Sequence, residues 1–226
     1  MVELIPNENE VEYRAYFVQP PFALWGDGKS IVSGLYQAYD LSPYDLEKIL
    51  IESGDSAAAR VELRLSERAS FIFRFDRVEA NLRSFLDAEL DLFPGFIARG
   101  VGWLRTAAPG LQLRSHLVTY VTHASLSEGS ASDVLKSAAP YSPIGLGEDL
   151  GTGASFHFRI PENKWHVDLL LDSSLKVKNG LVVRYNIWWE QDASDYVTTL
   201  VEARRLLNEC LSKIGLSFRT AGQLET

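Results

Sequence analysis

The fold is decided by residues 154–189, which read ASFHFRIPENKWHVDLLLDSSLKVKNGLVVRYNIWW. Apolar and polar side chains alternate along three runs in this stretch, as is typical of strands with one buried face. Turn residues at Pro161–Lys164 and at Lys178-Asn179-Gly180 separate the runs. A two-residue Asn-Gly turn would place the apolar residues of the last two runs on opposite faces. We therefore predict a three-stranded antiparallel meander, with a three-residue second loop and Gly180 in the left-handed conformation.

A long amphipathic helix is predicted to follow the meander and to cover its apolar face. Its stripe recurs at helical spacing and consists of Val197, Leu200, Ala203, Leu207, Cys210, Leu211 and Ile214. Asp192 is the predicted N-cap, and Gly215 fits the position just after the last turn.

The rest of the chain also shows the two-residue periodicity of strands and the helical spacing of apolar residues. We predict strands at 11–18 and 111–126, a hairpin at 59–78, and helices at 29–39, 42–53, 79–92 and 131–138. Pro94-Gly95 is expected to break or kink the third helix, with a second helical piece after it. The chain ends, residues 1–10 and 220–226, carry few apolar anchors and are expected to be loose.

The predicted hairpin has a register that satisfies both of its faces. Six apolar residues share one face, paired as Leu65 with Phe71, Leu63 with Phe73, and Val61 with Phe75. Glu62 then lies opposite Arg74, and Arg60 opposite Asp76, which are pairs of opposite charge on an exposed face.

These elements predict an α+β protein with a mainly antiparallel sheet and helices packed on one face. We expect a single domain over residues 1–226. Residues 11–108 and 111–219 each read strand, helical segment, hairpin and long helix. Two similar β-α-β-β-α halves would explain this order, and two unrelated α+β pieces would explain it equally well.

Composition disfavours several classes of partner. The 226 residues are 46% hydrophobic, which suffices for a core without disulfides or metals, and the formal net charge is -8. Lysines and arginines are scattered, with no run of three, so neither nucleic acid nor an anionic membrane surface is an expected partner. No secretory signal and no membrane-spanning stretch is found in the sequence, and a cytoplasmic location is expected.

No catalytic or cofactor motif is found in its proper structural context, and no cofactor is expected. Residues 26–30, GDGKS, resemble the end of a phosphate-binding loop but lack its first glycine. The glycine-rich residues 145–153 include two carboxylates that would repel a phosphate, so we interpret them as an exposed loop. His116 and His123 are seven residues apart on one strand, which places them on opposite faces, so they cannot share a metal. The single cysteine, Cys210, is interpreted as a buried small apolar residue.

The face of the meander opposite the apolar one carries the best candidate ligand site. Its predicted register places His157 opposite Asp168 and His166 opposite Arg159, and the next strand adds Arg184 and Asn186. A His–Asp pair beside an arginine suits acid–base chemistry or anion binding. A solvated sheet face with complementary charges explains the same pattern.

The same face also carries Leu170 and Trp188, which the predicted register places opposite each other. An apolar pair among polar residues indicates a cover, supplied by the chain itself or by a partner. From this patch and the lack of motifs, we expect a non-enzymatic interaction or accessory protein that binds a protein partner or itself. The alternative is a small-molecule-binding protein or enzyme with its site around His157, Asp168, His166 and Arg184.

Overall fold

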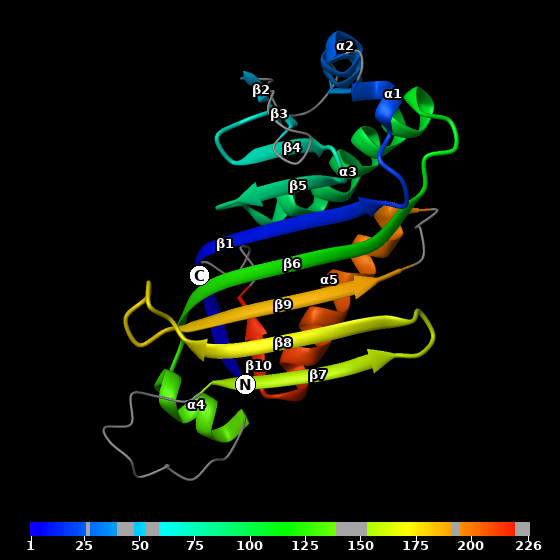
Figure 1. Cartoon of the computed structure of the whole chain (residues 1–226). Coiled ribbons are helices and arrows are strands. Elements are labelled where there is room, and N and C mark those ends of the chain that lie inside the picture. Colours follow the sequence, from blue (N-terminus) through cyan, green and yellow to red (C-terminus); the bar gives the residue numbers. More distant parts are fainter. Residues whose placement is uncertain (26–27, 40–47, 53–58, 139–152, 191–194, 220–226) are drawn as a thin grey trace, which may run out of the picture. The chain divides into compact units, whose positions relative to one another are not determined.

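The computed structural model describes residues 1–25, 28–39, 48–52, 59–138, 153–190 and 195–219. This part of the chain contains ten strands and five helices (Figure 1). The strands are β1 (Val2–Phe17), β2 (Lys48–Glu52), β3 (Arg60–Arg64), β4 (Ala69–Arg74), β5 (Arg77–Arg83), β6 (Leu113–Leu126), β7 (Ala154–Ile160), β8 (Trp165–Ser173), β9 (Leu181–Trp189) and β10 (Leu216–Phe218). The helices are α1 (Phe22–Trp25), α2 (Gly28–Tyr39), α3 (Asp87–Ala107), α4 (Ala131–Ala138) and α5 (Tyr196–Lys213).

The strands form one sheet in the order β2-β3-β4-β5-β1-β6-β9-β8-β7, and β10 pairs with β1. The β2–β3, β3–β4, β4–β5 and β7–β8 pairs are antiparallel, whereas β10 runs parallel to β1. The predicted α+β class with a mainly antiparallel sheet is thus confirmed.

The chain forms two compact units, and neither is a continuous stretch of sequence. Unit 1 comprises Met1–Glu10, Thr119–Ile187 and Ala203–Thr226, and unit 2 comprises Val11–Val118 and Trp188–Glu202. The long elements β1, β6, β9 and α5 contribute residues to both units.

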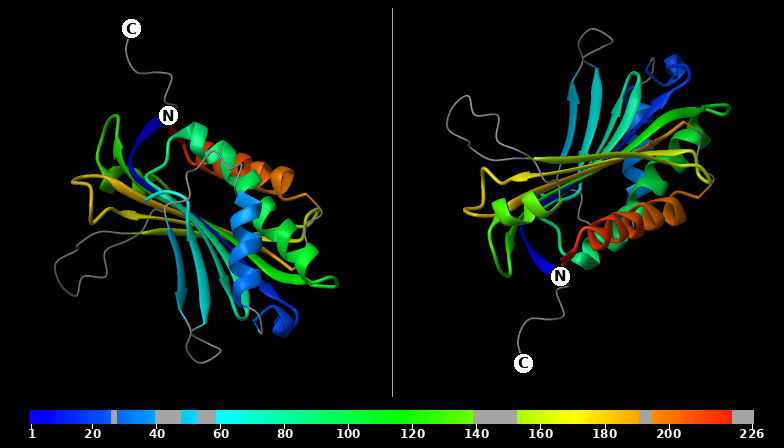
Figure 2. Two further views of the ribbon diagram at one scale, coloured as in Figure 1. Left: turned by 90° about the horizontal axis from the view of Figure 1, so that it is seen from above. Right: turned by 90° about the horizontal axis from the view of Figure 1, so that it is seen from below.

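Unit 1 contains the predicted meander, which the structure confirms as β7, β8 and β9. The turn at 161–164 sets the predicted register, with Phe156 opposite Leu169. The two views of Figure 2 show the C-terminal part of α5 lying across one face of the meander. The buried side chains on this face of β8 and β9 and in this part of α5 are Trp165, Val167, Leu169, Leu171, Leu181, Val183, Tyr185, Ile187, Ala203, Leu207 and Leu211.

The loop between β8 and β9 is longer than predicted. Strand β8 ends at Ser173, and the backbone N–H of Ser174 donates to the carbonyl of Gly180 over 2.8 Å. The left-handed residue is Asn179, with φ 54°, and not Gly180. A glycine is required at position 180 because a Cβ there would lie 2.5 Å from the carbonyl oxygen of Ala124.

The expectation of a loose N-terminus is wrong. Residues 2–10 belong to β1, and the side chain of Leu4 is fully buried. The cause is strand β10, which the sequence did not predict and which pairs Val2 with Leu216. Gly215, at φ 78°, ends α5 as predicted and turns the chain into this strand. Residues 220–226 lie outside the described part.

The residue that caps the start of α5 is not the predicted one. Asp195 accepts a hydrogen bond from the backbone N–H of Thr198 over 3.1 Å, so it caps the helix, and the predicted cap Asp192 lies outside the described residues. Tyr196 is buried in place of Val197, which is 45% exposed. The apolar stripe of the helix therefore begins one residue earlier than predicted.

Unit 2 confirms the hairpin but with a register shifted by two residues. Leu63 pairs with Phe71, and Glu62 with Ile72. The hydroxyl oxygen of Ser66 accepts hydrogen bonds from the backbone N–H groups of Arg68 and Ala69, which tightens the turn and shortens the predicted loop. Because the shift is even, the apolar residues stay on the predicted face.

Two predicted helices in unit 2 are wrong in part. Residues 48–52, predicted as the end of a helix, form β2 and pair with β3, and residues 42–47 lie outside the described part. Residues 79–83, predicted as the start of a helix, belong to β5, because pairing with β4 satisfies their backbone groups. Helical spacing of leucines did not reveal these pairings with strands that are adjacent in sequence.

Helix α3 runs through Pro94 without the predicted break. Its other predicted apolar residues, Phe96, Ile97, Val101 and Leu104, are buried. A proline inside a helix costs about 3 kcal/mol, and burial of several large apolar side chains offsets that cost at roughly 1.5–3 kcal/mol each. Helix α2 forms as predicted and packs on α3. The two helices meet at Gly34, where a Cβ atom would overlap the ring of Trp103.

Burial of the N-terminal strand gives a direct test. Leu4→Asp should lower the free energy of unfolding by about 2–5 kcal/mol, because it removes core contacts and buries a charge. Glu8→Ala, on an exposed side chain of the same strand, should leave the free energy of unfolding nearly unchanged. Chemical denaturation of both variants measures these costs, and equally small losses would show that the segment contributes nothing to the core.

Candidate functional site

The polar face of the β7–β8 hairpin brings together part of the predicted site. His157 and Asp168 are direct cross-strand partners, and the His157 Nδ1 atom lies 2.5 Å from the Asp168 Oδ1 atom. The other ring nitrogen of His157, Nε2, lies 2.9 Å from the hydroxyl oxygen of Ser155. The structure thus forms a Ser155–His157–Asp168 relay.

Ser155 is the member of this relay that sequence reasoning missed. It lies two residues before His157 on β7, and residues at this spacing share a face of a strand. The alternation itself was therefore the signal that could have found it. The turn at 161–164 completes the relay, because it sets which residue of β8 stands opposite His157.

The relay is open to solvent. The side chain of His157 is 69% exposed and that of Asp168 is 27% exposed. A hydrolytic nucleophile needs donors for the developing oxyanion and a site that excludes water. The arrangement has the proton path of such a site, but its exposure favours binding over catalysis.

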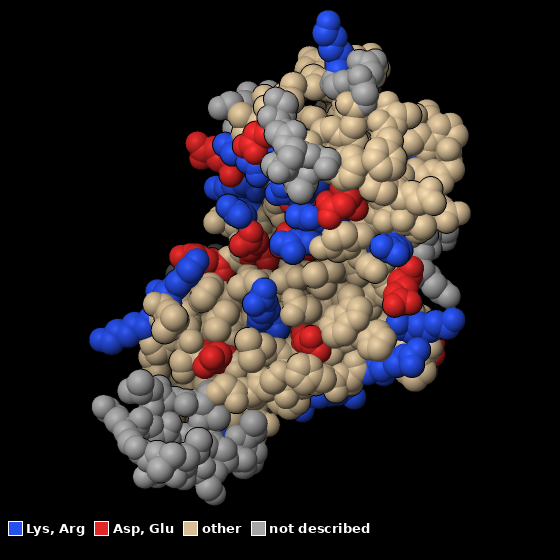
Figure 3. Space-filling view, in the orientation of Figure 1, with Lys and Arg blue, Asp and Glu red and all other residues tan. Residues whose placement is uncertain are grey.

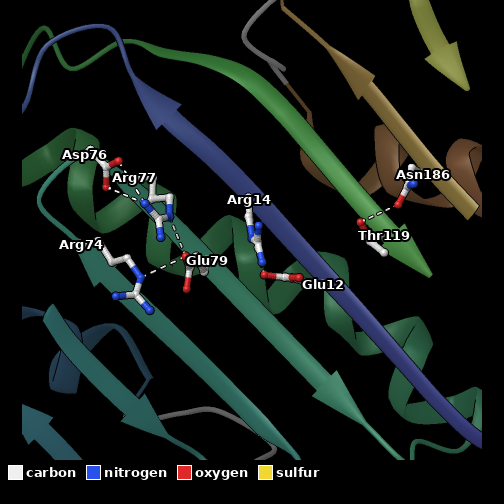
Figure 4. A network of polar contacts seen from close by, with 8 residues as sticks. All are labelled: Glu12, Arg14, Arg74, Asp76, Arg77, Glu79, Thr119 and Asn186. Carbon is white, nitrogen blue, oxygen red and sulfur yellow. Dashed lines mark hydrogen bonds and ion pairs between the residues drawn. The ribbon is translucent and has the colours of Figure 1, made fainter. Parts of the chain in front are cut away.

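The remaining predicted residues lie along the same strands. Arg159 and His166 are cross-strand partners with exposed side chains. Arg184 is exposed on β9, whereas Asn186 is half-buried and accepts a hydrogen bond from the Thr119 hydroxyl over 2.9 Å (Figure 4). Asn186 therefore has a partner within the sheet.

The predicted interaction pair is divided between the two units. Leu170 is half-buried in unit 1, and Trp188 is half-buried in unit 2. Their pairing stays a prediction.

The opposite face of β7 borders a cavity of about 400 Å³ within unit 1. Phe156, Phe158 and Ile160 line it from β7, and Leu206, Cys210 and Ile214 line it from α5 and its end. Sequence reasoning assigned Phe156, Phe158, Ile160, Cys210 and Ile214 to apolar faces but did not include Leu206. It missed the cavity, because an alternating pattern does not reveal how closely a helix packs on a strand.

In unit 2, basic and acidic side chains alternate over β3, β4 and β5 (Figure 3). Glu62, predicted to be exposed opposite Arg74, is 7% exposed and accepts a hydrogen bond from Arg64 over 2.8 Å. Glu79 is 5% exposed and lies 2.6 Å from Arg77 and 3.0 Å from Arg74 (Figure 4). Each buried carboxylate is thus neutralised by arginines, so the face offers a structural network and not an anion site.

The electrostatics of Glu79 follow from these contacts. Burial alone would raise the pKa of its carboxyl group, but the hydrogen bond from Arg77 and the ion pair with Arg74 outweigh burial and lower the pKa below the ordinary value of 4.5. The ion pairs therefore stabilise the fold above that pH.

The other histidines have structural neighbours. His116 is buried in unit 2, where it stacks on Trp189 at 5.0 Å and its Nδ1 atom lies 3.0 Å from the Tyr13 hydroxyl. His123 in unit 1 lies 2.8 Å from the Ser174 hydroxyl. Within the described residues, no group of three or more potential ligands could hold a metal ion.

Two glycine-containing motifs fall partly outside the described part of the chain. Residues 26–27 and 139–152 are not among the described residues, and Lys29 is an exposed residue at the start of α2. Among the helices that the structure describes, none is both long enough and apolar enough to cross a membrane.

The Glu79 network predicts a pH-dependent stability. Glu79→Gln should lower the free energy of unfolding at neutral pH by about 1–3 kcal/mol, because it leaves two arginines without their buried partner. The folded-state pKa is lowered, so this contribution is complete above pH 4.5 and is lost as the pH falls through the folded-state pKa. The stabilities of the wild type and the variant should therefore converge in acid.

Denaturation curves between about pH 3 and 7, which includes the range where carboxyl groups titrate, measure this convergence. Glu52→Gln is the matched control, since Glu52 pairs with Arg60 at 58% exposure and should contribute only about 0–1 kcal/mol. A Glu79→Gln loss that stays constant with pH would contradict the assigned ion pairs.

Comparison with known proteins finds no protein-family model and no curated protein that matches this sequence. The function must therefore be argued from the geometry of the β7 strand, which carries the relay on one face and the cavity on the other.

Proposed function

We propose that this chain is a non-enzymatic interaction protein that pairs an extended segment of a protein partner, or of a second copy, with the outer edge of β7. The observation that carries the proposal is the position of β7 at the end of the sheet, where β8 is its sole partner among the described strands. An edge strand presents a row of backbone donors and acceptors, and strand addition is a recurring mode of peptide recognition.

The sequence of β7 supports this role. Proteins usually protect edge strands with lysine, proline or a bulge. Strand β7 reads ASFHFRI, with neither lysine nor proline, and Phe158 is 40% exposed on it. An added strand would meet Ser155, His157 and Arg159 on one face, and these polar groups would select its side chains.

The proposal includes the finer structural predictions made from the sequence. It places the helices on one face of the sheet. It retains both explanations for the repeated order of elements in residues 11–108 and 111–219, two similar halves and two unrelated pieces. It also expects neither nucleic acid nor a membrane as a partner, on the ground of the net charge of -8 and the scattered basic residues. The predicted cytoplasmic location is part of the proposal as well.

Lysines placed in the edge strand test the proposal. Ser155→Lys combined with His157→Lys should abolish strand addition, because inserted charges protect an edge. His166→Lys is the matched control, since it makes the same change on the same face of β8, an interior strand. Size-exclusion chromatography with light scattering measures self-association, and affinity capture with mass spectrometry measures binding of partners.

Both variants should keep the wild-type melting temperature, since the changed side chains are exposed. We expect association to be lost in the edge variant and kept in the His166→Lys control. A wild-type protein that stays monomeric and captures nothing, or an edge variant that associates as well as the control, would contradict the proposal.

The Ser155–His157–Asp168 relay favours a second candidate, an enzyme or small-molecule site on the polar face. This site would use His157 as the base and Asp168 to orient it, with His166, Arg159 and Arg184 nearby along the strands to hold an anionic group. The exposure of the relay to solvent argues against this second candidate.

A fluorophosphonate probe separates the two candidates. A reactive serine would be labelled at Ser155, and His157→Asn would remove the label because it removes the base. Ser137→Ala, at an exposed serine of α4, is the control that should change nothing. If the wild-type protein is not labelled, as we expect, the relay is a set of surface hydrogen bonds; labelling of Ser155 would overturn the non-enzymatic assignment.

A further inference from the structure

The cavity beside β7 is a feature of unit 1 that the proposed strand pairing does not explain. It lies between the apolar face of β7 and the C-terminal part of α5, on the side opposite the Ser155–His157–Asp168 relay. Its volume of about 400 Å³ falls in the range of small-molecule sites. It is therefore large enough for a ligand and is distinct from the edge at which we place a partner strand.

The cavity exists because α5 buries its main stripe elsewhere. Ala203, Leu207 and Leu211 are buried, whereas Leu206 and Cys210, on the neighbouring flank of the helix, are only half-buried. Opposite this flank, Phe158 is 40% exposed although it lies on the helix-covered face of β7. Large apolar side chains left uncovered on an otherwise packed face indicate an apolar occupant.

The charges at the rim select the polar end of this occupant. Glu209 and Lys213 both border the cavity, one turn apart on α5. The Glu209 carboxylate accepts a hydrogen bond from Arg205 over 2.9 Å, so Arg205 offsets part of its negative charge, and Arg205 and Lys213 together exceed it by one positive charge. The Lys213 ammonium then outweighs the partial negative charge of about 0.5 at the helix C-terminus, and the rim favours an anion.

We propose that this cavity binds an amphipathic monoanion, of the class of medium-chain carboxylates. The alkyl chain lies between β7 and α5, and the head group meets Lys213 at the rim. This inference does not rest on the strand-pairing function.

Cys210 provides a reporter inside the cavity, because it is the single cysteine of the chain. Burial raises the pKa of its thiol, and the nearby Glu209 carboxylate adds to this effect. The thiol should therefore react slowly with a maleimide even in the empty protein. A bound alkyl chain would cover it and slow the reaction further.

The experiment measures the rate of Cys210 alkylation in the full chain during titration with decanoate below its critical micelle concentration. Saturating decanoate should slow alkylation about tenfold, decanol should act only at higher concentration, and decyltrimethylammonium should act at the highest concentration of the three. Circular dichroism confirms that the chain stays folded throughout. An alkylation rate unaffected by decanoate would overturn the proposal without any variant.

Two variants locate the ligand. Leu206→Trp should fill the cavity and abolish protection of Cys210 by decanoate. Lys213→Gln should weaken the binding of decanoate about three- to fivefold, as expected for one exposed ion pair, and leave the binding of decanol unchanged. Lys178→Gln, at an exposed lysine in the β8–β9 loop, is the matched control. Equal weakening by both lysine variants, or protection that persists in Leu206→Trp, would show that the anion binds elsewhere.

Discussion

The cross-strand register of β7 and β8 is the constraint on which both proposed sites of unit 1 depend. It sets His157 against Asp168 on one face and Phe156 against Leu169 on the other. A slip of one residue would turn every side chain of β7 to the opposite face. The relay would then face α5, and the phenylalanines would face away from it. The four-residue turn at 161–164 and the burial of Leu169 and Trp165 hold this register together.

The two faces of β7 differ because only one of them is covered by a helix. Burial of Leu207 and Leu211 positions α5, and the flank of the helix that carries Cys210 is left apart from β7. The same edge position that leaves room for the cavity also leaves the backbone of β7 without a second strand among the described residues. The proposed ligand site and the proposed pairing edge thus have a single structural cause, the position of β7 at the end of the sheet.

Unit 2 manages its polar sheet face in a different way. Glu62 and Glu79 are nearly as buried as the core, and each is surrounded by arginines from its own or an adjacent strand. A buried carboxylate is tolerated only when it is paired, so these contacts constrain the strands that carry them. This face therefore contributes to the fold, whereas the polar face of β7 and β8 remains exposed.

Local patterns were sufficient to predict several elements and one cross-strand pair. The meander, α2, α4 and the predicted His157–Asp168 pair all formed as expected, because a period or a short turn specifies them. Helical spacing failed at residues 79–83 and 48–52, which became strands when β4 and β3 supplied their hydrogen bonds. The prediction for the loop at Gly180 was wrong because the constraint on this glycine, its close approach to Ala124, comes from another strand.

The sequence by itself determined the α+β class, the faces of the meander and the residues of its polar side. The tertiary structure alone decided that residues 2–10 form a strand, since β10 arrives beside them from the far end of the chain. It also decided that a cavity lies between Phe158 and α5. The physical reason is the same in each case: a period specifies which side of an element a residue takes, but only packing between distant segments specifies what that side meets.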